Sequence, residues 1–208
     1  TAFGVKILPV RVLGKCGGFD SDIQAGMRWA AGLDVPGVPR NPNPARIVNL
    51  SLGGSGSCAT SGYPAVIQEL LAVGTTVVAA AGNSAGHAVE VPANCDGVIA
   101  VAGLRHVGSK VGYSDLGPQI AISAPAGNCI NLGENEPCLY PILTAINSGT
   151  TVPGNNTYSD SFNYSVGTSF SAPLVAGAAA LMLSVNPRLT PGQVRTMLRA
   201  TARAFPTS

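Results

Sequence analysis

The sequence predicts an α/β fold built on a mostly parallel sheet, and three observations support this. Predicted strands alternate with predicted helices along most of the chain. Several of these strands are short apolar runs of the kind that a parallel sheet buries on both faces. The longest apolar run, residues 172–185, spans about 14 residues, short of the roughly 20 that cross a bilayer, and indicates a core helix. The 208 residues suit one domain with a sizeable core.

The first predicted element is a strand, because residues 5–12 are apolar and rich in β-branched side chains. A helix follows, with Asp20 or Ser21 expected to cap it. Its apolar residues fall on one helical face, namely Ile23, Met27, Ala30 and Ala31. The chain therefore opens with a strand followed by an amphipathic helix.

A second group of elements follows a loop rich in Pro, Gly and Asn. Residues 46–52 and 75–81 are predicted strands, and residues 63–73 between them are a predicted helix that Gly74 stops. Residues 98–102 and 119–123 are further short apolar runs. All four runs have the length and composition of buried parallel strands.

The last third combines an elaborate surface region with two helices. Residues 127–165 are rich in Gly, Asn, Pro and Thr, and short runs such as residues 142–146 predict hairpins. A helix apolar on all sides is expected to begin near Ser169, to run through the core and to end at Asn186. Thr190 and the proline after it then predict the capped start of a surface helix.

Charge and cysteine content narrow the class of protein. The chain has 12 basic and 10 acidic residues and no basic run, which argues against nucleic acid or an anionic membrane as the main partner. Five cysteines in or beside loop-like segments, without the spacing of a zinc site, favour an oxidising, extracellular setting. No signal peptide is visible at Thr1, so we expect either that it was removed or that the chain begins internally.

The most informative motif is the string GTSFSAP at residues 167–173, which leads into the long apolar helix. A serine at a helix start, flanked by glycine, is exposed, and the helix amides point at the negative charge that its attack would create. We expect Ser169 to be a nucleophile. Asn83, after another predicted strand, offers an amide that could stabilise an oxyanion. Glycines at positions 53, 54 and 82 leave backbone groups open to an extended peptide.

In these strings the chain resembles the subtilisin-like serine proteases of the subtilase superfamily. GTSFSAP resembles the family's nucleophile signature, NLSLGG its substrate-binding strand and AAAGN the segment that carries its oxyanion asparagine. KILPVRVLG and VPANCDGVIAVAG resemble the flanking strands, so the resemblance covers about residues 5–203. It implies a three-layer fold with helices on both faces of the sheet. The cysteines and the Pro/Asn-rich insertion resemble secreted bacterial members.

The resemblance also assigns roles to individual residues. It makes Ser169 the nucleophile and Asn83 the oxyanion donor, with Thr168 beside the oxyanion. It places the pocket for the side chain before the cleaved bond between two walls, formed by Ser51, Leu52 and Gly53 and by Ala80, Ala81 and Gly82. Gly17 and Gly18 would pair with the other side of the bound substrate. No charge in the sequence clearly faces the pocket, so we expect a medium to large apolar residue there.

The family's aspartate and histidine, in DTG or DSG and HGTH settings, have no counterpart here, and the family order places both before the strand that resembles residues 5–12. We therefore expect an N-terminal fragment of the same protease to carry them, so that residues 1–208 are the larger C-terminal part of the catalytic domain. Cys16 would form a disulfide with a cysteine of that fragment. Cys58 with Cys95 and Cys129 with Cys138 are then plausible pairs, although four cysteines allow three connectivities.

Three alternatives stay open at this point. His87 or His106 could act as the base, although a solvated loop histidine is the simpler interpretation. The chain could be a peptide-binding module without turnover. It could also be a sedolisin-type acid protease, whose glutamate base would also lie upstream.

Two further interpretations concern structure. Asp20 and Asp22 could bind the structural calcium found in many subtilases, although two carboxylates beside a helix start are more often a cap and a helix-dipole partner. Ser171 is expected to be a small packing residue rather than a second nucleophile.

Overall fold

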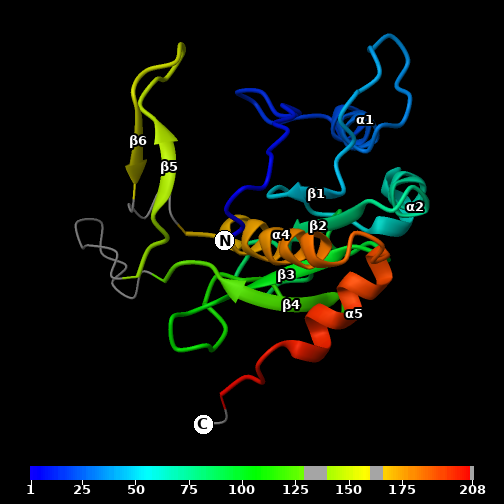
Figure 1. Cartoon of the computed structure of the whole chain (residues 1–208). Helices are drawn as coiled ribbons and strands as arrows, with labels where there is room; N and C mark the ends of the chain where they lie inside the picture. The colour runs from blue at the N-terminus through cyan, green and yellow to red at the C-terminus, as the bar shows by residue number, and fades with distance from the viewer. Residues whose placement is uncertain (129–139, 160–165, 207–208) are drawn as a thin grey trace.

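The computed structural model describes residues 1–128, 140–159 and 166–206, and its centre is a parallel sheet of four strands in the order β1-β2-β3-β4 (Figure 1). The strands are β1 (Ile47–Leu50), β2 (Thr76–Ala80), β3 (Ile99–Leu104) and β4 (Ile120–Pro125). Each corresponds to one of the predicted apolar runs. Every strand lies beside the next one in the chain, so all the carboxyl ends meet at one edge of the sheet.

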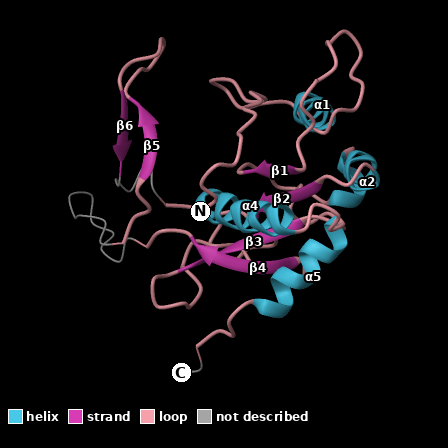
Figure 2. Cartoon of the chain, viewed as in Figure 1, coloured by secondary structure: helices cyan, strands magenta, loops and turns pink. Residues whose placement is uncertain are grey.

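The sheet is covered on both faces, which explains why its strands are apolar throughout. In β2, Val77 and Ala79 belong to the core cluster that α1 (Asp20–Ala30) and α2 (Tyr63–Ala72) also form. Val78 and Ala80 face the opposite cluster, with α4 (Thr168–Val185) and α5 (Pro191–Thr201). Figure 2 shows these helices flanking the magenta strands. The predicted three-layer α/β fold is therefore confirmed.

Helices α1 and α2 pack on one face and are joined by an ion pair between Arg28 and Glu69, at 2.6 Å. A short 3-10 helix, η1 (Cys58–Thr60), precedes α2. The predicted cap of α1 is wrong, because Phe19 occupies the N-cap position without a side-chain cap. Asp20 lies instead in the first turn, where its carboxylate accepts a hydrogen bond from the Tyr63 hydroxyl at 3.0 Å.

Helix α4 contacts all four strands of the sheet, as its apolar sequence predicts. By length and mean hydropathy alone, 18 residues and 1.6, it could cross a membrane, but in this fold it is a core helix. Its burial is one-sided, since Leu181 is 45% and Val185 88% exposed. The helix therefore lies against the core as expected, but among the described residues one of its apolar faces is uncovered.

The predicted strand at residues 5–12 does not form. The segment is extended, but it joins no ladder among the described strands, and Ile7 is 86% exposed. Val10 and Val12 still pack partly against the core. A strand needs a hydrogen-bonding neighbour, and here neither this segment nor the outer edge of β1 has one within the part of the chain that is described.

Strands β5 (Thr144–Asn147) and β6 (Asn156–Ser159) form an antiparallel hairpin, as predicted for the region around residues 142–146. Figure 1 shows this hairpin standing away from the central sheet.

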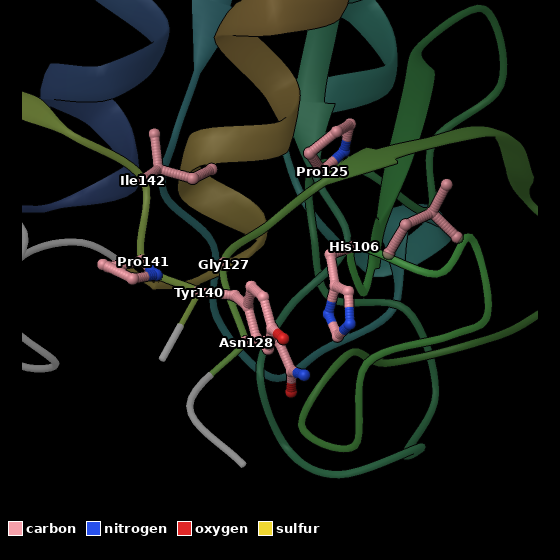
Figure 3. Close-up of a pocket in the computed structure, with 8 residues that line it drawn as sticks. His106, Pro125, Gly127, Asn128, Tyr140, Pro141 and Ile142 are labelled. Carbon is pink, nitrogen blue, oxygen red and sulfur yellow. The ribbon is translucent and has the colours of Figure 1, made fainter. Parts of the chain in front are cut away.

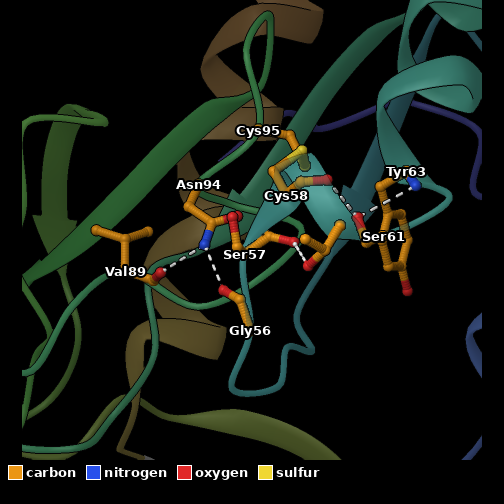
Figure 4. The surroundings of a disulfide bond; sticks show 9 residues. Gly56, Ser57, Cys58, Ser61, Tyr63, Val89, Asn94 and Cys95 are labelled. Atoms are coloured by element: carbon orange, nitrogen blue, oxygen red, sulfur yellow. Dashed lines mark hydrogen bonds between the residues drawn. A yellow bond between two sulfur atoms is a disulfide. The ribbon is translucent and has the colours of Figure 1, made fainter.

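A disulfide joins Cys58 and Cys95, which confirms one of the expected pairs (Figure 4). It ties the loop before α2 to the loop before β3. The Asn94 side chain reinforces the link by donating to the carbonyls of Gly56, at 2.8 Å, and Val89, at 3.0 Å. Cys16 is exposed and unpaired in the described chain, and the predicted Cys129–Cys138 pair lies outside the described residues.

Candidate active site

Ser169 is the second residue of α4 and lies beside the chain that leaves β1. The Ser51 hydroxyl donates to the Ser169 carbonyl at 2.7 Å, and the Ser169 hydroxyl donates to the Ser51 carbonyl at 3.3 Å. Because β1 and β2 are parallel neighbours, the segments after both strands lie at the same edge of the sheet. The fold thus brings three sequence motifs to one place, the first and last of which are separated by more than a hundred residues.

The turn that presents Ser169 depends on Gly167, whose φ of +142° lies in the region that favours glycine. The Gly167 N–H donates to the Ala126 carbonyl at 2.8 Å and to the Tyr113 hydroxyl at 3.0 Å. Burial raises the pKa of Tyr113 to about 12, although the bond from Gly167 opposes that shift. Sequence reasoning missed Tyr113, because nothing in its own segment marks it as a support for a turn 54 residues later.

Asn83 is held in one orientation by Thr168. Its Oδ1 accepts hydrogen bonds from the Thr168 N–H at 2.9 Å and from the Thr168 hydroxyl at 3.0 Å. The Nδ2 group lies 3.7 Å from the position of a Cβ built on Gly167, beside the turn into Ser169, and no protein acceptor takes its hydrogens in the described structure. This amide is free to donate to a negative charge that develops next to Ser169.

Neither histidine is bonded to Ser169 in the described residues. The His106 ring stacks on Tyr140, with centroids 3.6 Å apart, beside a cavity of about 340 Å³ (Figure 3). The backbone carbonyl of His87 accepts from the Leu116 N–H, and its side chain is exposed. The geometry therefore gives no support to a base drawn from this chain's own histidines.

The predicted pocket walls lie at the same edge of the sheet. Ser51, Leu52 and Gly53 follow β1, and Leu52 packs partly against the core. Ala80 and Ala81 are buried, one in each core cluster, and the Ala81 N–H and carbonyl are bonded to the Val101 carbonyl and the Glu90 N–H. Gly82 has a φ of +113°, and its N–H donates to the Thr168 hydroxyl at 3.3 Å.

The predicted second substrate strand lies in a tight turn. Gly14 and Gly17 form an antiparallel bridge, and Gly18 packs against the Val12 carbonyl and Leu13. No hydrogen bond joins Gly17 or Gly18 to the Ser169 region within the described ranges, so their role stays a prediction.

Ser171 is buried and donates to the Ala124 carbonyl at 2.9 Å, which confirms that it is a packing residue. No group of three or more His, Cys, Asp or Glu side chains gathers anywhere in the described residues, Asp20 and Asp22 included. The predicted calcium site therefore stays a prediction without support from the arrangement of these carboxylates.

Two acidic residues that the sequence did not single out, Glu90 and Asp115, lie beside Gly82. Burial, and then the charge of Asp115, raise the pKa of Glu90 above its usual range.

Comparison with known proteins matches this geometry to one family. All of residues 1–208 match the model described as "Subtilase family". The chain is 49% identical to an extracellular protease of Xanthomonas campestris pv. campestris and 37% identical to an extracellular basic protease of Dichelobacter nodosus. The alignments cover 99% and 98% of this chain but only 33% and 32% of those proteins.

A solved structure of a protease from Pseudoalteromonas arctica superposes with a TM-score of 0.89 at 42% identity, over 99% of this chain and 58% of that one. A cold-adapted subtilisin-like serine proteinase superposes with a TM-score of 0.66 at 28% identity, over 92% of this chain and 58% of that one. The chain spans about a third of the length of the two curated relatives named above.

Proposed function

This chain belongs to the subtilase family, and on that premise we propose that the protein containing it is a secreted serine endopeptidase whose nucleophile is Ser169. The observation that carries the proposal is the convergence of Ser169, Thr168 and Asn83 at the start of α4. A binding function alone would require neither a serine at this turn nor an oriented, unused amide.

In the proposed reaction, Ser169 Oγ attacks the carbonyl carbon of the scissile peptide bond. The carbonyl oxygen becomes negatively charged and accepts hydrogen bonds from Asn83 Nδ2 and from the Ser169 N–H at the positive end of α4. Collapse of this intermediate releases the amine and leaves an acyl group on Ser169. Water then cleaves the ester bond, which restores the serine.

The substrate is proposed to be a polypeptide bound as an extended strand. Ser51, Leu52 and Gly53 leave β1 beside Ser169, and their backbone groups can pair with the residues before the cleaved bond. The backbone of Ala80, Ala81 and Gly82 forms the opposite wall. Gly17 and Gly18 would pair with the other side of the peptide.

We assign the histidine that takes the Ser169 proton, and the aspartate that orients it, to an N-terminal part of the same protease. Three features of the described chain support this assignment. Ile7 is exposed in the extended segment, the outer edge of β1 lacks a neighbouring strand, and one apolar face of α4 is uncovered. A further segment packed here would cover all three surfaces, and the exposed Cys16 lies in the same part of the chain.

An extracellular location fits the Cys58–Cys95 disulfide and the names of the relatives, two of which are called extracellular proteases. Calcium at Asp20 and Asp22 would act on structure rather than on the reaction, because both residues belong to the first turn of α1.

Labelling with a fluorophosphonate, which reacts only with an activated serine, tests the proposal in the complete protease. We expect stoichiometric labelling on the peptide that contains Ser169, none in Ser169→Ala and unchanged labelling in the matched control Ser171→Ala. Without the aspartate and histidine, the rate enhancement over the reaction in water should fall to about 10³–10⁴-fold. Residues 1–208 alone should therefore label very slowly.

Two results would contradict the proposal. Fast labelling of residues 1–208 alone that disappears in His87→Ala would make His87 the base. A complete protein that binds peptides but neither labels nor cleaves them would be a binding module.

A further inference from the structure

The pocket predicted to lie between the two walls has a carboxylate inside it. A Cβ built on Gly53 would lie 2.8 Å from Glu90 Oε2, and one built on Gly82 would lie 2.8 Å from the Glu90 carboxyl carbon. The glycine walls are therefore close enough to touch the same side chain from opposite sides. Glu90 reaches this place because its N–H donates to the Ala81 carbonyl at 2.9 Å, and Val91 pairs with Gly54.

A second carboxylate adjoins the first. Asp115 Oδ2 contacts the position that a Gly82 Cβ would occupy, so it lies on the same side of Gly82 as Glu90. The segment is fixed by two hydrogen bonds, from the Asp115 N–H to the Gly82 carbonyl at 3.1 Å and from the Ser84 N–H to Asp115 Oδ1 at 2.9 Å. These two bonds fix the orientation of the Asp115 side chain.

The Asp115 carboxylate also lacks part of its hydrogen bonding. It is completely buried, and its Oδ2 has no hydrogen-bond partner in the described chain. The ion pairs found in that chain join Arg28 to Glu69 and Arg40 to Asp34, so no arginine or lysine neutralises the Glu90–Asp115 pair. A buried carboxylate oxygen without a partner is costly, and a ligand that donates hydrogen bonds would remove that cost.

The chemistry of the pair selects the ligand. Two adjacent carboxylates favour a cation that carries several N–H donors, and guanidinium and ammonium groups have this form. The raised pKa of Glu90 is the effect expected of a carboxylate that is partly buried beside another acid and lacks a cation. A metal site would need more donors, and no third His, Cys, Asp or Glu joins the two among the described residues.

We propose that Glu90 and Asp115 form an acidic floor in the pocket for the residue before the cleaved bond, and that the protease therefore prefers substrates with lysine or arginine at that position. This inference rests on the proposed function, because it takes Ser169 as the nucleophile and residues 51–53 and 80–82 as the pocket walls. It replaces the apolar preference that the sequence alone suggests.

Paired peptide substrates test the preference in the complete protease. The peptides differ only in the residue before the cleaved bond, which is lysine, arginine, citrulline or phenylalanine; citrulline is the neutral isostere of arginine. We expect kcat/KM for lysine and arginine to exceed that for citrulline and phenylalanine by about tenfold or more, the effect of one charge-assisted hydrogen bond.

Neutral isosteres of the two acids test which residues cause the preference. Glu90→Gln and Asp115→Asn should each lower the ratio of kcat/KM for arginine over citrulline by about tenfold. Asp34→Asn removes one exposed carboxylate of the loop after α1 and should leave the ratio unchanged. An unchanged ratio in Glu90→Gln, or an enzyme that cleaves after phenylalanine as well as after arginine, overturns the inference while the proposed protease function stands.

A binding measurement keeps the two proposals separable if no peptide is cleaved. Ser169→Ala in the complete protein should bind the arginine peptide more tightly than the citrulline peptide in calorimetry, and Glu90→Gln should remove the difference. Equal binding overturns the acidic floor. Calcium ions that bind wild type but not Glu90→Gln, without any preference for arginine, would identify the pair as a metal site and overturn the inference as well.

Discussion

Asn83 and Thr168 show how single hydrogen bonds set the chemistry of this site. Thr168 donates two of them to Asn83 Oδ1, which fixes the orientation of the amide and leaves the Nδ2 hydrogens free to donate. Thr168 is completely buried, so water does not compete for these bonds. The proposed oxyanion donor is thus oriented before substrate arrives, which is the condition for strong electrostatic stabilisation.

Asn83→Ala in the complete protease is expected to lower kcat by about 10²–10³, a magnitude that itself comes from a subtilisin, and to change KM little. The reason is that the amide interacts with the oxyanion rather than with the bound ground state. Steady-state kinetics on a peptide substrate measure both constants. Ser84→Ala, which shortens the neighbouring exposed side chain, should match wild type; a large rise in KM with normal kcat would refute the role.

The sequence singled out Ser169 and Asn83 because short local motifs carry them. It did not single out Glu90 and Asp115, because their significance lies only in proximity. The two residues are 25 positions apart in the chain and become neighbours through the backbone bonds that Glu90 makes to Ala81 and Asp115 makes to Gly82. Neither acid belongs to a sequence motif that predicts contact with Gly53 or Gly82.

At the scale of elements, α4 begins correctly only because another segment holds its first turn. The Tyr113 hydroxyl lies within hydrogen-bond distance of the Ala126 and Gly127 carbonyls and accepts from the Gly167 N–H. It therefore links the strand end after β4 to the residue that precedes the nucleophile turn.

Tyr113→Phe should lower the free energy of unfolding by about 0.5–1.5 kcal/mol at neutral pH, the value of one hydrogen bond. The tyrosine pKa is raised from 10 to about 12 in the folded protein, so this contribution is complete below pH 10 and is lost as the pH rises toward 12. Urea unfolding at pH 8, 10 and 12 measures the difference between variant and wild type. A difference that stays constant to pH 12 would contradict the assignment.

The elements themselves were largely predictable. Helix α5 has the capping box that Thr190 signals, with Gln193 bonded back to Thr190. The conformation of residues 5–12 could not be predicted, because a strand is defined by its hydrogen-bonded neighbour. An apolar β-branched run has the same sequence pattern whether or not that neighbour is present. The same limit applies to α4, whose composition does not reveal which face is left uncovered.

At the scale of the whole molecule, the Cys58–Cys95 disulfide fastens the segment after β1, which carries one proposed pocket wall, to the segment that carries Glu90. Gly54 and Val91, within those segments, also pair through their backbones. The 37-residue separation makes this a substantial restraint on the unfolded chain.

Replacing both cysteines in Cys58→Ser/Cys95→Ser should lower the free energy of unfolding by about 3–4 kcal/mol in the chain-entropy model. Chemical unfolding of the complete protease, monitored by fluorescence, measures the change. Ser57→Ala at the adjacent exposed position serves as the matched control. A loss below about 1 kcal/mol would show that the restraint acts little on the unfolded state.

The order of strands along the sheet also has a consequence for biosynthesis. Because β1, β2, β3 and β4 follow one another both in the chain and in space, each can pair with a finished neighbour as it leaves the ribosome. Ser169 comes after all of them, on the helix that contacts every strand. The edge of the sheet where a peptide is proposed to bind can therefore take shape before the group that would cut it.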